Sequence, residues 1–208
     1  ILFQMEHGRN HLVPNRGYGG TEDFALKIFQ LFMPVTGHRM DFLAAAKKEY
    51  NDNAFFVNEN DFSSLGIVVF GGFLLMVAFQ LFCRSGGNGH NDDRVSLLEK
   101  LSTLNIAAIL LATMGGFGSI ISPLIRYTIR AYNRMSIFIA FFSIVALLLV
   151  IGIIYDRYFK DKKKIVFSMI NRTFSLHIGN LMFGFLVILM TALGLFDQTT
   201  AGFIPHYS

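Results

Sequence analysis

Four long apolar runs separated by polar connections dominate the chain after residue 62. Each run approaches the roughly 20 residues that a helix needs to cross the hydrocarbon core of a membrane. A single segment in lipid has to satisfy its own backbone hydrogen bonds, so each run is predicted to be a helix. The predicted spans are residues 65–83, 101–121, 136–154 and 177–196. They predict an all-α fold, a polytopic transmembrane helical bundle over residues 63–208.

Residues 1–62 are more polar and form a predicted loop region. Their one apolar segment, residues 24–35, reads FALKIFQLFMPV. This segment is too short to cross a bilayer, and an apolar stretch of that length before a proline is typical of a helix lying in the membrane interface. We therefore predict an interfacial helix that ends at Pro34.

Composition supports a membrane protein and argues against other classes. The 208 residues are 53% hydrophobic and 15% charged, with a mean hydropathy of +0.49, whereas soluble domains carry about 25% charged residues. Cys83 is the only cysteine, so neither a disulfide framework nor a Cys/His zinc pattern is available. The net charge of +4 is spread over the loops, which does not indicate nucleic-acid binding. No cofactor is predicted in this chain, and a divalent metal in a longer protein stays open.

The positions of lysine and arginine predict the orientation in the membrane, because cytoplasmic loops carry an excess of both. The connection 155–176 holds six of them and is predicted to be cytoplasmic. Alternation then places 84–100 on the same side. The N-terminal region, the connection between the second and third spans, and the C-terminal tail are predicted to lie on the other side, the periplasm or the exterior.

Three arginines stand immediately before the third span. Arg126, Arg130 and Arg134 are spaced four apart, with Tyr132 and Asn133 beside them. On an α-helix this spacing places the three side chains on one face. A guanidinium group matches phosphate oxygens in a bidentate way, so the row predicts a lipid phosphate or pyrophosphate site. The alternative is that the arginines only reach into the headgroup layer.

A second polar cluster is PVTGHRMD, residues 34–41, where a tight turn presents His38 and Arg39. A histidine donates to a phosphate or moves a proton near neutral pH. Both residues are therefore predicted to contribute to lipid-phosphate binding. The alternative is an ordinary solvated turn.

A third cluster, VNENDFSSLG, residues 57–66, precedes the first span. Asp61, Ser63 or Ser64 is expected to cap that helix, since aspartate and serine are preferred capping residues. Glu59 is a candidate contact for a sugar hydroxyl, and the alternative is that it pairs with an arginine from the other external loop.

Four segments in this order resemble one family of large bacterial inner-membrane proteins: ALKIFQLFMPVTGHRM, VNENDFSSLG, LLATMGGFGSIISPLIRYTIRAYNRMSIFIAFF and LGLFDQTTAGFIP. Its members are labelled sugar translocases, phosphoglycerol transferases or membrane glycosyltransferases, and their spans look similar to those of GT-C glycosyltransferases. The resemblance implies a polyprenyl-phosphate-linked sugar used on the external face. It also implies that this chain is an internal piece of a longer protein and that the catalytic base precedes it.

The leading hypothesis is therefore part of a GT-C-like membrane transferase that acts in cell-envelope polysaccharide synthesis. The alternatives are a transporter of lipid-linked saccharides, a phosphoglycerol-type transferase whose chemistry lies in another domain, and a non-catalytic membrane scaffold. The motifs of common soluble catalysts, such as GxSxG, HExxH and the Walker loop, do not occur in the sequence. Whether the chain is itself an enzyme, and which residues would be catalytic, stays open.

Overall fold

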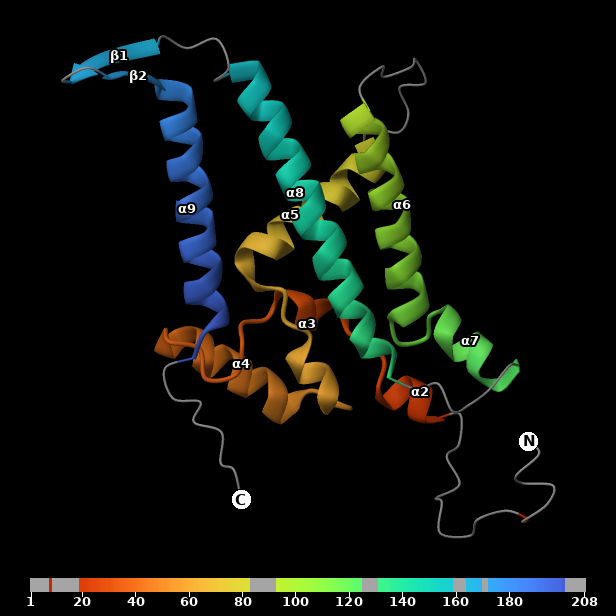
Figure 1. Ribbon diagram of the computed structural model, residues 1–208. Helices are drawn as coiled ribbons and strands as arrows, with labels where there is room; N and C mark the ends of the chain where they lie inside the picture. Colours follow the sequence, from red (N-terminus) through yellow and green to blue (C-terminus); the bar gives the residue numbers. More distant parts are fainter. Residues whose placement is uncertain are drawn as a thin grey trace.

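The computed structural model describes residues 8, 19–82, 93–124, 131–158, 164–169 and 172–200, and for residues 164–169 and 172–178 it describes the backbone alone. This part of the chain is mostly helical. Three helices are long and apolar enough to cross a membrane: α6 (Asp93–Ala112), α8 (Ser136–Tyr158) and α9 (Ile178–Gln198). They stand upright beside one another in Figure 1. The predicted helical class is thus confirmed, with three helices that fit a membrane protein, and the third and fourth predicted spans match α8 and α9 within a few residues.

The first predicted span corresponds to α5 (Gly66–Phe82), which is apolar but has 17 residues. At 1.5 Å per residue it is about 25 Å long, less than the roughly 30 Å of a hydrocarbon core. Whether α5 crosses the membrane as a fourth span therefore stays a prediction. Helix α5 crosses α8 closely at Gly72, where an added Cβ would lie 2.4 Å from the backbone oxygen of Ser143. Small residues permit this kind of close helix contact in membranes.

The second predicted span, 101–121, was placed too late in the sequence. The helix α6 ends at Ala112, and a separate short helix, α7 (Phe117–Leu124), follows. Gly115 turns the chain with a φ of +69°, a conformation that glycine adopts without strain. A Cβ on Gly118 would lie 2.6 Å from the Leu111 oxygen, so α7 packs back on the end of α6. The apolar run does not distinguish one long helix from a helix, a turn and a second helix.

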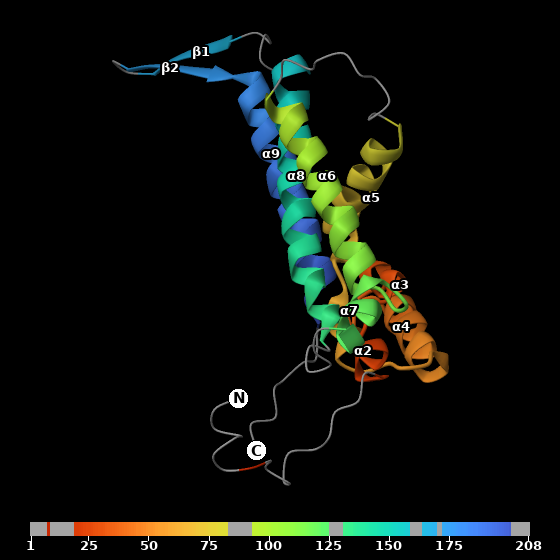
Figure 2. The ribbon, with the colours of Figure 1, turned by 90° about the vertical axis from the view of Figure 1, so that its right-hand side faces the viewer.

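The N-terminal elements gather at one end of the long helices (Figures 1 and 2). They are α2 (Gly19–Asp23), α3 (Ile28–Phe32), α4 (Asp41–Asn53) and the 3₁₀ helix η1 (Glu59–Ser63). The predicted helix over 24–35 is reduced to α3, and α4 was not predicted. Leu26 and Leu31 are fully buried, and the Leu26 N–H donates to the Ala112 oxygen at 2.8 Å. This segment is packed against the end of α6, because its leucines complete the bundle core there.

The core has two parts. The larger one joins the N-terminal elements to the helices and contains Leu26, Leu31, Leu65, Phe73, Ala108, Ala112, Tyr132 and Ile139. The smaller one lies further along α5, α6 and α8 and contains Met76, Leu98, Leu101 and Ala146. The N-terminal elements are thereby fixed to the membrane helices, which matters for any site built between them.

At the opposite end of the bundle lies an antiparallel hairpin, β1 (Lys164–Met169) and β2 (Arg172–His177), in which Lys164 pairs with His177 (Figure 1). The sequence had indicated only a basic loop there. The hairpin and the N-terminal elements lie at opposite ends, as the predicted alternation requires. Which of the two ends is external stays a prediction.

Candidate functional site

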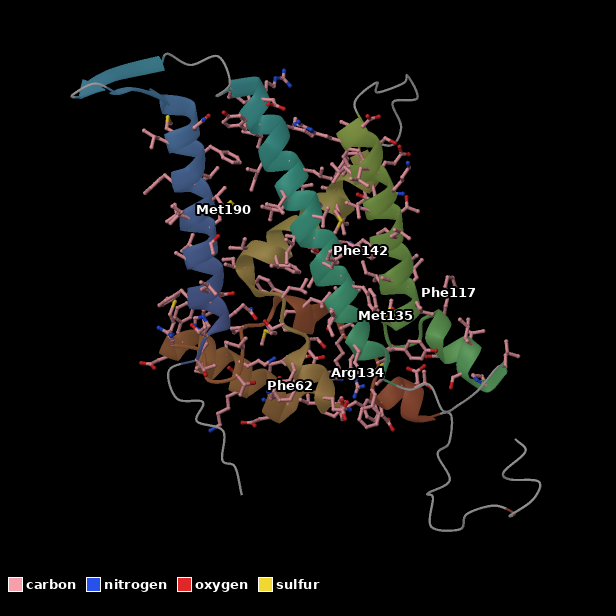
Figure 3. All side chains as sticks on the ribbon, viewed as in Figure 1. Phe62, Phe117, Arg134, Met135, Phe142 and Met190 are labelled. Atoms are coloured by element: carbon pink, nitrogen blue, oxygen red, sulfur yellow. The ribbon has the colours of Figure 1, made fainter. Side chains whose placement is uncertain are left out.

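A pocket of about 280 Å³ opens at the end of the bundle where the N-terminal elements gather. It lies between η1 and the 3₁₀ helix η2 (Tyr132–Met135), which leads directly into α8. Figure 3 shows Arg134 and Phe62 at this end of the molecule. The lining residues combine charge, amide, hydroxyl and apolar groups: Glu59, Phe62, Ser63, Asn133, Arg134, Ser136 and Ile137.

The η1 side of the pocket is held by a fully buried amide, Asn60. Its Nδ2 donates to the backbone oxygens of Phe56 at 2.9 Å and Ala25 at 3.3 Å, and its Oδ1 accepts from Gln30 Nε2 at 2.9 Å. A buried amide with its groups satisfied rigidifies its surroundings. Glu59 and Ser63 are therefore presented from a fixed segment.

A buried ion pair fixes the same segment to α4. The side chain of Lys47 is 1% exposed, and its Nζ lies 2.7 Å from Asp61 Oδ1. Asp61 also accepts hydrogen bonds from Thr36 at 2.7 Å and Asn51 at 2.9 Å. Burial raises the pKa of Asp61, but these hydrogen bonds and the charge of Lys47 outweigh burial and hold the pKa below its ordinary value. Asp61 is thus a structural anion and not a helix cap.

The η2 side of the pocket is held by the backbone of Asn133, whose N–H donates to the Phe24 oxygen at 3.1 Å. Tyr132 is 8% exposed and belongs to the core, where its ring packs on Gly118, so it does not line the pocket. Ala131 has φ −83° and ψ 60°, which is not helical. Arg134 therefore does not lie on an α-helix continuous with Arg130, contrary to the sequence prediction.

Arg126 and Arg130 lie outside the described residues, so their predicted role in phosphate binding stays a prediction. Arg134 is described, and its guanidinium lies 3.5 Å from the Glu59 carboxylate. This is the pairing that the sequence offered as the alternative for Glu59. Their side chains are 72% and 53% exposed, and such surface pairs contribute only about 0–1 kcal/mol. An anion with better geometry can therefore displace Glu59 from Arg134.

Asn133 lines the pocket and carries an acceptor that the described residues leave unpaired. Its side chain is buried, and its Oδ1 has no hydrogen-bond partner among the described residues. A buried acceptor without a partner is costly, so a donor from outside, such as a hydroxyl, would be favoured there. Together with the Arg134 donors and the Glu59 acceptor, the pocket can hold a ligand that carries both an anionic group and hydroxyl groups.

His38 and Arg39 form a different cluster, at the end of α9. The Met40 N–H donates to His38 Nδ1 at 3.1 Å, so the proton of the neutral ring is on Nε2, which faces Asp197 Oδ1 at 3.4 Å. Arg39 is exposed, donates from Nε to the Thr199 oxygen at 3.3 Å, and stacks over Phe196 at 5.7 Å. The turn therefore attaches α9 to the N-terminal elements.

Asp197 has a role that the sequence analysis missed. Its Oδ2 accepts the Ile67 N–H at 2.8 Å, which caps the start of α5. The predicted cap from Asp61, Ser63 or Ser64 is wrong, because Asp61 pairs with Lys47 and Ser64 donates to the Met33 oxygen at 2.5 Å. A cap normally lies within a few residues of its helix, and no local pattern indicates a partner 130 residues away.

Among the described residues, no three His, Cys, Asp or Glu side chains gather in a way that would hold a metal ion. Comparisons with protein-family models, curated proteins and solved structures gave no match. The function is therefore argued from the geometry of the pocket.

Proposed function

We propose that this chain is part of a membrane transferase that binds a polyprenyl-phosphate-linked sugar in its Glu59–Arg134 pocket. One observation carries the proposal: at the end of a long apolar helix, one pocket is lined by an exposed, weakly paired arginine and by Asn133, whose buried Oδ1 has no partner among the described residues. The phosphate replaces Glu59 on the guanidinium, for which a bidentate oxyanion is the better ligand. Sugar hydroxyls then meet Asn133 Oδ1 and the released Glu59 carboxylate.

The same arrangement is suited to transfer of the sugar. When the bond between the sugar and the phosphate breaks, negative charge develops on the leaving phosphate, and a fixed guanidinium stabilises charge where it develops. Arg134 is assigned this electrostatic role, and Arg126 and Arg130 are expected to add to it. The catalytic base and the acceptor are not assigned to any residue of this chain.

The test measures binding of decaprenyl phosphate and decaprenyl-phosphate glucose or mannose to the chain in lipid nanodiscs. Arg134→Gln should weaken binding of each compound by about 10- to 100-fold, as expected for loss of a charge-assisted contact worth about 1.5–3 kcal/mol. Arg134→Lys should restore only part of the affinity, because a lysine cannot bind in a bidentate way. The control is Arg157→Gln, an exposed arginine at the other end of α8, which should bind normally.

Glu59→Gln separates sugar from phosphate recognition. It should weaken binding of the sugar-bearing lipids and leave decaprenyl phosphate unaffected or bound more tightly, since a competing anion is removed. Equal affinity of Arg134→Gln and the unmodified chain for all of these lipids would refute the proposed site.

A translocase is the alternative, in which the pocket only binds the headgroup of a lipid-linked saccharide in transit. A fluorescent lipid-linked saccharide that this chain moves between the leaflets of a vesicle, without transfer of the sugar, would support the translocase over the transferase.

A further inference from the structure

Helix α9 is attached to the bundle at both ends and stands away from it between them. At one end, Asp197 contacts Ile67 and His38. At the other end, the Tyr155 hydroxyl donates to Asn180 and its ring packs on Phe183, with 4.8 Å between the ring centres. Only 6% of the most apolar 18 residues of α9 are buried, compared with 33% of those of α6.

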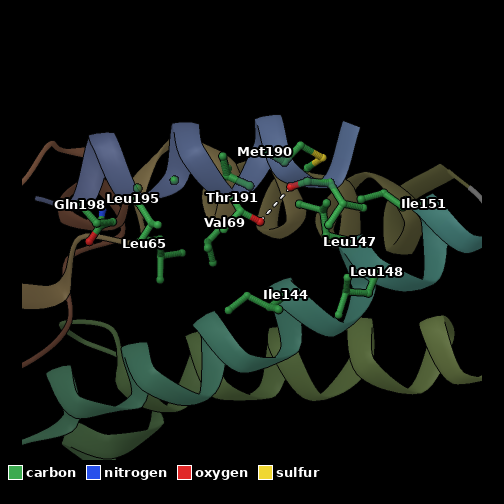
Figure 4. Close-up of a pocket in the computed structure, with 14 residues that line it drawn as sticks. Leu65, Val69, Ile144, Leu147, Leu148, Ile151, Met190, Thr191, Leu195 and Gln198 are labelled. Carbon is green, nitrogen blue, oxygen red and sulfur yellow. Dashed lines mark hydrogen bonds between the residues drawn. The ribbon is translucent and has the colours of Figure 1, made fainter. Parts of the chain in front are cut away.

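The space between α9, α8 and the first turn of α5 is a groove of about 390 Å³ (Figure 4). Its lining is almost entirely aliphatic, and the hydroxyl of Thr191 is satisfied by the Val187 oxygen of its own helix at 2.8 Å. Lining side chains are open to the surroundings, with Leu148 57% and Leu195 62% exposed. The groove therefore attracts an apolar occupant and offers it no internal hydrogen bond.

The dimensions of the groove select among apolar occupants. The lining of α9 runs from Val187 to Gln198, about 16 Å at the helical rise. This is the depth of one leaflet, half of a hydrocarbon core of about 30 Å. A single extended hydrocarbon chain that reaches through one leaflet matches this length.

The polar end of the groove is suited to a phosphate. Gln198 lines this end, and the exposed guanidinium of Arg39 lies over the Phe196 ring of the same helical turn. We propose that the groove holds one acyl chain of a membrane phospholipid, with the phosphate of its headgroup on Arg39. This lipid would fill the space between α9 and α8. The proposal shares no residue with the Glu59–Arg134 pocket and does not depend on the proposed function.

Native mass spectrometry of the detergent-purified chain, titrated with palmitoyl-oleoyl phosphatidylglycerol, tests the proposal. Gly194 lines the groove, and a Cβ there makes only an ordinary contact of 3.8 Å with Val68. Gly194→Leu therefore places a side chain in the groove. The matched control is Gly184→Leu on the same helix, where a Cβ would meet nothing within 4 Å. The unmodified chain and Gly184→Leu should each retain one phospholipid that Gly194→Leu does not.

Three further measurements complete the test. Thr191→Leu, a second groove-filling change, should reproduce the loss and serves where Gly194→Leu does not fold. Arg39→Gln should weaken retention about tenfold, which corresponds to about 1.4 kcal/mol. Decaprenyl phosphate should fail to displace the phospholipid. The proposal would be overturned if both groove-filling variants retained the phospholipid, or if decaprenyl phosphate displaced it. It would also be overturned if the unmodified chain were a dimer without bound phospholipid and the groove-filling variants were monomers.

Discussion

Replacing Gly66 with alanine should separate α5 from the end of α9. Gly66 begins α5 with a φ of +73°, and an added Cβ would lie 2.8 Å from Asp197 Oδ2 and 2.4 Å from Gln198 Nε2. The Gln198 side chain can move aside at little cost. Asp197 cannot, because the same oxygen accepts the Ile67 N–H.

The size of the effect follows from two contributions. A non-glycine residue in the left-handed region costs roughly 1–2 kcal/mol. Loss of a helix cap costs about 0.5–2 kcal/mol. The free energy of unfolding of Gly66→Ala should therefore fall by about 1.5–4 kcal/mol. Unfolding in dodecylmaltoside micelles by added SDS, followed by far-ultraviolet circular dichroism, measures it.

A matched control lies five residues further along the same helix. Gly71 has no positive φ, and a Cβ there would meet nothing within 4 Å. Gly71→Ala should be neutral or stabilising by up to about 1 kcal/mol, because alanine is the better helix former. The double variant of Gly66→Ala with Asp197→Ala should be less destabilised than the sum of the two, since both remove one cap. Additive effects, or equal stability of the two glycine variants, would refute the reasoning.

Two other predictions concern packing and pH. Gly72→Ala should lower the free energy of unfolding by about 1–3 kcal/mol through overpacking, since its Cβ would lie 2.4 Å from a backbone oxygen of α8 that cannot move alone. The same SDS titration measures this change, and wild-type stability would show that α5 and α8 cross more loosely. Folding lowers the pKa of Asp61, so its contribution to stability is complete above the unfolded value of about 3.9 and is lost as the pH falls through the lower folded value. Asp61→Asn leaves the buried Lys47 charge unpaired and should lower the free energy of unfolding by about 3–5 kcal/mol at neutral pH. It should also weaken the dependence of stability on pH below about pH 4. An unchanged pH dependence in that range would contradict the prediction.

The membrane helices could be predicted because their signal is local. A run of about 20 apolar residues has few alternatives in lipid, and α8 and α9 follow their runs closely. The boundaries of α6 could not be predicted in the same way, since Gly115 and Gly116 interrupt an apolar run that continues beyond them. The docking of Leu26 against Ala112 was also missed, because an apolar segment reads alike whether it faces lipid or the end of a bundle.

The candidate site was only partly predictable, for a related reason. Glu59 and Arg134 carry opposite charges and were assigned to one side of the membrane, so their pairing was a foreseeable alternative. The helical arginine row was inferred from spacing alone. Spacing fixes a face only while the backbone stays helical, and Ala131 is not helical. The role of Asp197 depends on a contact between distant segments and has no local signature.

The contrast in burial between the two layers of the pocket favours binding over a purely structural role. Asn60 and Asn133, which lie on the buried side of the pocket, are 0% and 4% exposed. The side chains of Glu59 and Arg134, on its open side, are more than half exposed. A pair that served only stability would gain more if it were buried and well bonded, as Lys47 and Asp61 are. The buried residues hold the pocket rigid beneath a weakly paired, open guanidinium. An incoming anion binds more tightly to such an arrangement, because the pocket is ordered before the ligand arrives.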